Sequence, residues 1–68
     1  MFLIQFHWQN PKVPNETEFV AQGEFDNPES VNVWARELIE RRGNEKPDGW
    51  VPMLCDRHAP EFAVTRAL

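Results

Sequence analysis

One short stretch of the sequence places a nucleophile close to a base: Cys55-Asp56-Arg57-His58. A neighbouring imidazolium lowers the pKa of a thiol, so a Cys–His pair can supply a reactive thiolate. Cys55 and His58 could equally form part of a zinc site, with the distant His7 as a further ligand. Structural zinc takes four ligands and usually at least two cysteines. We therefore predict a structural role for both residues, with metal or small-ligand binding as an alternative.

Other sequence patterns that support catalysis are missing from the chain. There is no glycine-rich phosphate loop, and no pair of carboxylates has the spacing of an acid–base site. Ser30 falls in the first turn of a predicted helix rather than in a nucleophile elbow. We expect a protein that is not an enzyme and that needs no cofactor.

A group of carboxylates shares one sequence parity: Glu16, Glu18, Glu24 and Asp26. No basic residue occurs in residues 15–30, so one edge of the predicted sheet should carry negative potential. With His7 on the polar side of the adjacent strand, this surface would attract a protein partner with a basic surface. As a further possibility, this acidic surface would imitate a nucleic-acid backbone and occupy a basic groove of the partner. The same charges also protect an edge strand from aggregation, which is the simpler interpretation.

The end of the predicted helix carries four basic residues: Arg36, Arg41, Arg42 and Lys46. Such a cluster could contact phosphates, which makes nucleic-acid binding a second alternative function. Three glutamates are interleaved with these residues: Glu37, Glu40 and Glu45. Because the opposite charges largely cancel, the pattern favours a solvated, ion-paired helix face.

The segment around Trp50 and Met53 is a second candidate contact surface. Three tryptophans are difficult to bury completely under one helix in so small a domain, and Trp and Met are enriched at interface cores. An exposed Trp50 would serve an unidentified protein partner or a homodimer, in which an edge strand could also pair across a two-fold axis. The alternative, which we favour, is that the segment forms the core face of a strand.

Two stretches alternate apolar and polar residues with the period of a β-strand: residues 2–9 and 17–25. The even positions of the first stretch are predicted to face the core. So are the odd positions of the second: Phe19, Ala21, Gly23 and Phe25. The loop over residues 10–15 allows the two strands to pair antiparallel. Gly23 indicates a bulge or a close approach of the helix.

A helix is predicted to follow, with Asn27 as N-cap and Pro28 in the first position, where its missing N–H costs nothing. Five apolar residues recur at helical spacing: Val31, Trp34, Ala35, Leu38 and Ile39. Gly43 is predicted to end the helix. Because Glu37 and Arg41 are four residues apart, they are predicted to form an ion pair.

A third strand over residues 50–55 and a short fourth strand over residues 62–66 complete the pattern. Pro52 lacks an N–H, so it indicates an edge or bulged strand. A right-handed crossover would place the third strand beside the first, in the order 2-1-3, with the fourth outside the third. We predict one α+β domain over residues 1–68, an antiparallel sheet of three or four strands with one helix packed on one face.

Composition limits the remaining functions. The 68 residues include 11 acidic and 7 basic side chains, for a net charge of −4, which disfavours nonspecific binding to nucleic acid or membranes. A single cysteine forms no intramolecular disulfide, and neither a signal peptide nor a membrane-spanning run is evident. We expect a cytoplasmic protein of the small, acidic type typical of phage or mobile-element accessory proteins. The predicted function is a non-catalytic protein-interaction module or inhibitor.

Overall fold

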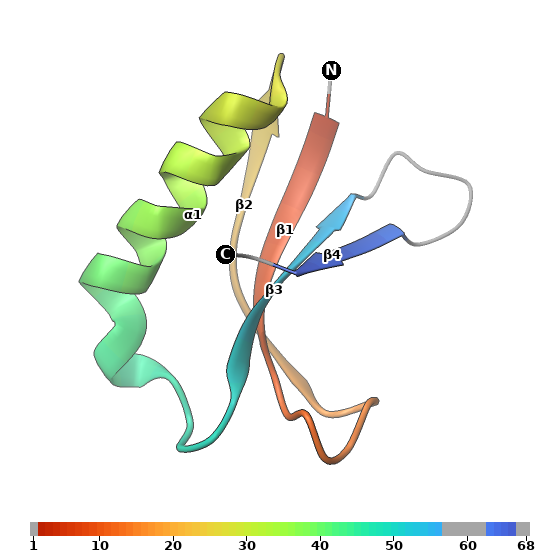
Figure 1. Cartoon of the computed structure of the whole chain (residues 1–68), viewed down its shortest axis with the longest axis vertical. Coiled ribbons are helices and arrows are strands. Elements are labelled where there is room, and N and C mark those ends of the chain that lie inside the picture. Colours follow the sequence, from red (N-terminus) through yellow and green to blue (C-terminus); the bar gives the residue numbers. More distant parts are fainter. Residues whose placement is uncertain (1, 57–62, 67–68) are drawn as a thin grey trace.

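The computed structural model describes residues 2–56 and 63–66 (Figure 1). The elements in chain order are β1 (Phe2–Gln9), β2 (Thr17–Phe25), α1 (Pro28–Arg42), the 3-10 helix η1 (Gly43–Glu45), β3 (Val51–Asp56) and β4 (Ala63–Arg66). All neighbouring strands are antiparallel, in the order β2-β1-β3-β4. The predicted α+β fold is confirmed, with β1 inside the sheet and β2 at its edge. Neither described helix is long and apolar enough to cross a membrane.

The core lies between α1 and one face of the sheet, and it is dominated by aromatic rings. Of the even positions of β1, Ile4, Phe6 and Trp8 are buried and Phe2 is half-buried against the same core, as the alternation predicts. The Phe6 ring makes edge-to-face contacts with Trp8 at 5.0 Å and with Trp34 of α1 at 6.2 Å between centroids. Such perpendicular pairs add to the stabilisation from burial. A small domain thus obtains most of its core from a few large side chains.

The start of α1 follows the predicted capping pattern. Asn27 has extended backbone angles, and its Oδ1 accepts a hydrogen bond of 2.9 Å from the Ser30 amide. Pro28 occupies the first turn. The cap satisfies one of the amides that every helix leaves unpaired at its N-terminus.

The end of α1 differs in conformation from the usual glycine stop. The helix ends at Arg42 as predicted, but Gly43 is right-handed, with φ −60° and ψ −26°. The chain continues through η1, which closes with a hydrogen bond of 3.2 Å from the Lys46 amide to the Gly43 carbonyl. The glycine with a positive φ, at 81°, is Gly49 in the loop before β3.

Gln9 is the one buried polar side chain among the residues whose burial the structure describes. Its Nε2 lies within 2.8–3.4 Å of four carbonyl oxygens of the β1–β2 loop, those of Asn10, Val13, Pro14 and Glu16. A single amide nitrogen is therefore close to four carbonyl oxygens at both ends of the loop. This fixes the path of the chain from β1 into β2.

Pro52 is tolerated within β3 because the described part of β4 pairs only with the residues of β3 that follow it. It pairs with Trp8 of β1, whereas the pairing of β4 with β3 runs from Met53 to Asp56. In the described part of the sheet, Pro52 thus has a neighbouring strand on one side only. Its missing N–H interrupts no bond to β4.

Gly43 and Gly49 provide a matched test of backbone conformation, because a Cβ added at either position meets no atom within 4 Å. Gly43→Ala should stabilise the fold by about 0.5 kcal/mol, since alanine restricts the unfolded chain. Gly49→Ala should destabilise it by about 1 kcal/mol, since alanine is strained at positive φ. Chemical denaturation of both variants measures the difference. Equal effects of the two substitutions would contradict the assigned conformations.

Gln9→Glu should destabilise the fold by about 3 kcal/mol at pH 7, because a carboxylate would face carbonyl oxygens instead of donating to them. These oxygens raise the pKa of the new carboxyl in the folded state above its unfolded value. The folded state then binds the proton more tightly, so the loss should shrink as the pH falls towards about 4. Thermal unfolding at both pH values measures this, with the exposed Gln22→Glu as the charge-matched control. A loss independent of pH would refute the described role of Gln9.

Candidate interaction surface

An extra residue in β2 changes which side chains face the helix. Ala21 pairs with Phe6, but the next pair along β1 joins His7 to Phe19, so Val20 is a bulge residue. Between Thr17 and Phe19, the odd-numbered residues of β2 therefore face away from α1, whereas beyond the bulge they face towards it. The prediction that Phe19 faces the core is therefore wrong: it lies on the face away from α1 and is 54% exposed. The bulge also lies at Val20 rather than at Gly23, where an added Cβ would come within 2.8 Å of the Phe25 ring.

The bulge also divides the predicted acidic surface. Glu18 pairs with Trp8 and thus belongs to the helix-facing side, whereas Glu24 pairs with Leu3 on the opposite side. The four carboxylates do not form one acidic face. They form an acidic edge along β2 and its flanks, made of Glu16, Glu18, Glu24 and Asp26, all exposed.

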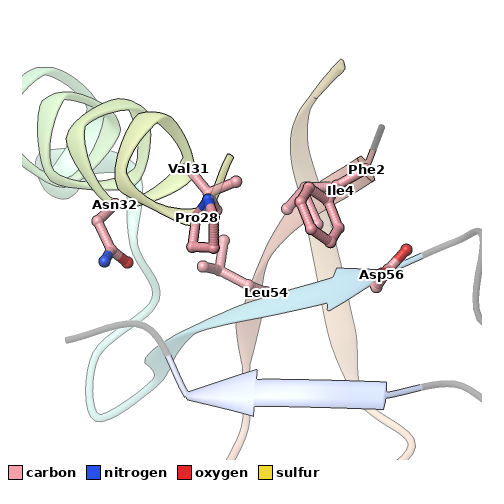
Figure 2. Close-up of a pocket in the computed structure, with 7 residues that line it drawn as sticks. All are labelled: Phe2, Ile4, Pro28, Val31, Asn32, Leu54 and Asp56. Carbon is pink, nitrogen blue, oxygen red and sulfur yellow. The ribbon is translucent and has the colours of Figure 1, made fainter. Parts of the chain in front are cut away.

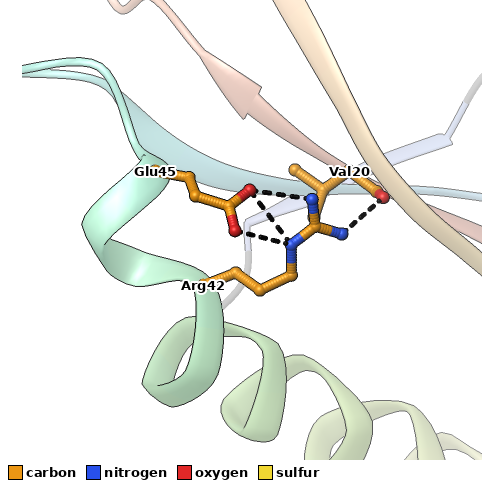
Figure 3. Close-up of polar contacts among 3 residues, drawn as sticks. All are labelled: Val20, Arg42 and Glu45. Carbon is orange, nitrogen blue, oxygen red and sulfur yellow. Dashed lines mark hydrogen bonds and ion pairs between the residues drawn. The ribbon is translucent and has the colours of Figure 1, made fainter.

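A guanidinium from the helix end holds the bulge. Arg42 Nη1 donates a hydrogen bond of 3.1 Å to the Val20 carbonyl, while Nε and Nη2 donate to the Glu45 carboxylate, the shortest at 2.8 Å (Figure 3). The hydrogen bonds between Arg42 and Glu45, with the attraction between their charges, lower the pKa of Glu45 and raise the pKa of Arg42. The contact ties β2 to the junction of α1 and η1.

The other helix-end cations are placed as follows. Arg41 forms the predicted ion pair with Glu37, 3.0 Å between Nη2 and Oε2. Lys46 Nζ donates a 2.8 Å hydrogen bond to the Trp50 carbonyl. Arg36 is exposed on the helix. Two of the three arginines named for phosphate contact thus have a carboxylate partner, which reduces the local positive potential.

The sheet face away from α1, here called the outer face, differs from the polar surface that the sequence suggested. Gln5 Nε2 donates to Gln22 at 2.9 Å, and Gln5 Oε1 lies 3.2 Å from His7 Nε2, so amides do occupy its middle. Apolar side chains surround them. The Phe19 ring packs edge-on against His7 at 5.5 Å, and Met53 pairs with His7 on the other side. The odd parity of Val51, Met53 and Cys55 in β3 was the signal for this surface.

Trp50 and Met53 do not form a joint surface. Trp50 is half-buried and packs against the core cluster under α1, whereas Met53 lies on the outer face. Trp8 is 2% exposed and Trp34 is half-buried, so the core accommodates all three tryptophans at least in part. The expectation that this segment belongs to the core holds for Trp50.

Cys55 is buried in β3 opposite Gln5, while Arg57 and His58 lie outside the described residues. His7 pairs with Met53, two residues from Cys55, so His7 and Cys55 occupy neighbouring positions of the outer face. Within residues 2–56 and 63–66 no group of three potential metal ligands occurs. The proposed pairing of Cys55 with His58 remains a sequence prediction.

Sequence reasoning missed a groove of about 210 Å³ between the start of α1 and the sheet. Its lining is mainly apolar and consists of Phe2, Ile4, Pro28, Val31, Asn32, Leu54 and Asp56. Figure 2 shows Asn32 and Asp56 at opposite ends of this row. One helix is narrower than a four-stranded sheet, which leaves the space beside β3. The groove is smaller than the roughly 300 Å³ at which small-molecule sites begin.

Comparison with known proteins yields no relatives: no family model, curated protein or solved structure matches this chain.

Arg42→Gln should raise the pKa of Glu45 towards its ordinary value, because the carboxylate loses the hydrogen bonds that stabilise its charged form. An NMR titration of the Glu45 side chain measures this. Since the folded pKa is the lower one, the stabilisation from this pair is present above the unfolded pKa and is lost as the pH falls through the folded pKa. Arg41→Gln is the control and should leave Glu45 unchanged. An unchanged pKa in Arg42→Gln would contradict the described contact.

Proposed function

We propose that this chain is a small, non-catalytic module that binds a protein partner with a basic surface through its acidic edge. The observation that carries the proposal is the distribution of charge. Both ion pairs of the described residues lie at the helix end, Arg41 with Glu37 and Arg42 with Glu45. The acidic edge has no such compensation, and residues 13–35 contain no lysine or arginine. Negative potential is therefore concentrated on one side of the molecule, where it would steer a cationic surface.

The structure of β2 suggests how the partner is recognised. An edge strand can pair with a strand of another protein through its free backbone groups. In β2 the bulge bends the ladder, and Arg42 already occupies the Val20 carbonyl. Both features oppose strand addition in the middle of β2. The partner would thus contact the carboxylates themselves, and the module would act as an inhibitor or accessory subunit by covering a basic surface.

The helix-end arginines support a protein partner more than a nucleic acid. Arg41 and Arg42 each have a carboxylate within 3.0 Å, so little positive charge is left to neutralise phosphates. The acidic edge would in addition repel a polyanion. A basic protein surface needs no unpaired cations on this chain, and the acidic edge attracts it.

The placement of Glu18 and Glu24 on opposite faces of β2 makes the proposal testable in detail. Immobilised wild-type protein should capture a partner from a cell lysate, and the double variant Glu18→Lys/Glu24→Lys should lower its affinity at least tenfold through like-charge repulsion. Each single variant should lose part of this affinity if the partner contacts both sides of the edge. Binding should also weaken with added salt. Affinities of the purified partner are measured by calorimetry.

Glu40→Lys/Asp48→Lys is the matched control, because both residues are exposed and the change in net charge is the same. It should retain the affinity of the wild type. If the edge variant binds as tightly as this control, or if salt has no effect, the acidic edge is not the binding surface. Circular dichroism verifies that both variants fold.

A further inference from the structure

Phe19 of β2 carries a large aromatic side chain that the bulge directs into solvent. Without the extra residue at Val20, a regular ladder would place Phe19 opposite Trp8, on the helix-facing side. In the structure Glu18 has that position, Phe19 is 54% exposed, and Val20 packs against the core. The fold thus buries a valine where a regular strand would bury a phenylalanine, and it forgoes the larger gain from burial.

Contacts on both sides of β2 fix the exposed position of Phe19. Arg42 donates its hydrogen bond of 3.1 Å to the Val20 carbonyl, which holds the bulge from the helix end (Figure 3). On the other side, the Phe19 ring packs edge-on against His7, at 5.5 Å between centroids. Bulges at sheet edges often re-aim a side chain towards a functional contact. A ring held in this way loses little conformational freedom when it is bound, which suits the anchor of an interface.

The charges around Phe19 favour a cationic group as its contact. Glu18 precedes it on the opposite side of the same edge strand, and Glu16 flanks the start of β2; both are exposed. Arg42, which reaches the bulge, is already paired with Glu45. The face of an aromatic ring attracts a cation, and arginine is the more frequent partner. A purely apolar partner group would instead desolvate the two neighbouring carboxylates, which disfavours their charges.

We propose that Phe19 is the anchor of the acidic edge and that its ring accepts an arginine guanidinium of the basic partner. This inference rests on the proposed function, because it names the group that the same edge recognises. The guanidinium would lie over the ring within about 6 Å of its centroid, with further cations of the partner opposite Glu16 and Glu18. Since Phe19 and Glu18 lie on opposite sides of β2, the partner would offer a basic groove that encloses the start of this strand, not a flat patch.

Two peptides of equal charge test the anchor: hexa-arginine and hexa-lysine, both with blocked ends. NMR titration of the wild type should show hexa-arginine binding about threefold more tightly, because a guanidinium stacks on an aromatic ring better than an ammonium does. The largest shifts should occur at the Phe19 ring protons and at the amides of residues 16–20. Phe19→Leu should abolish the preference for arginine, whereas Phe19→Trp should keep it. The ring shifts of the wild type report on the contact even where a substitution perturbs the fold.

Val33→Ala is the control, because it shortens a 58% exposed apolar side chain on α1 and should leave both affinities unchanged. Arginine also pairs with carboxylates through two hydrogen bonds. A preference for arginine that survives in Phe19→Leu would therefore come from the carboxylates, and it would overturn the anchor while the proposed function stands. A wild type that binds neither peptide would overturn the anchor too. If Glu18→Lys/Glu24→Lys binds both peptides as tightly as the wild type, the proposed function fails as well.

Discussion

The extra residue at Val20, with the guanidinium that holds its carbonyl, determines how the two faces of the sheet differ. Before the bulge, the even-numbered residues of β2, such as Glu18, belong to the helix-facing side of the sheet. After it, the odd-numbered residues, such as Ala21, do. One inserted residue thus turns Phe19 outward while Ala21, Gly23 and Phe25 stay beneath α1. Arg42 stabilises this arrangement because it reaches a carbonyl that a regular edge strand would leave to water. The outward position of Phe19 and the distribution of Glu18 and Glu24 over opposite sides of β2 both follow from this bulge.

Much of the architecture could be predicted because its determinants are local. The alternation in β1 identifies Ile4, Phe6 and Trp8 as core, and Asn27-Pro28 fixes the first turn of α1 by hydrogen bonding and ring geometry. The crossover rule then places β3 beside β1. The bulge could not be found in this way. Phe19 and Val20 are both apolar, so either parity is consistent with a strand, and the register depends on contacts with β1 and Arg42 that are distant in sequence.

The candidate surfaces are likewise predictable where they depend on local sequence, and not where they depend on the strand register. The run without bases along β2 is visible in the sequence, and the exposure of its carboxylates agrees with it. Their distribution over both sides of the edge depends on the bulge. The apolar part of the outer face results from a coincidence of register: His7 lies between Phe19 on one side and Met53 on the other. The periodicity of β3 places Val51, Met53 and Cys55 on one face, but it does not indicate the whole cluster, since the members of the cluster come from three strands.

The central position of β1 has a consequence for the order in which this domain can form. Its first neighbour, β2, follows after a short loop, and α1 can then cover that hairpin. Its second neighbour, β3, joins it through distant pairs such as Ile4 with Asp56. Until those pairs form, the most apolar strand of the protein is itself an edge, with one row of backbone groups unprotected. The search for these distant partners should set the folding rate, and aggregation through β1 is the competing reaction during that interval.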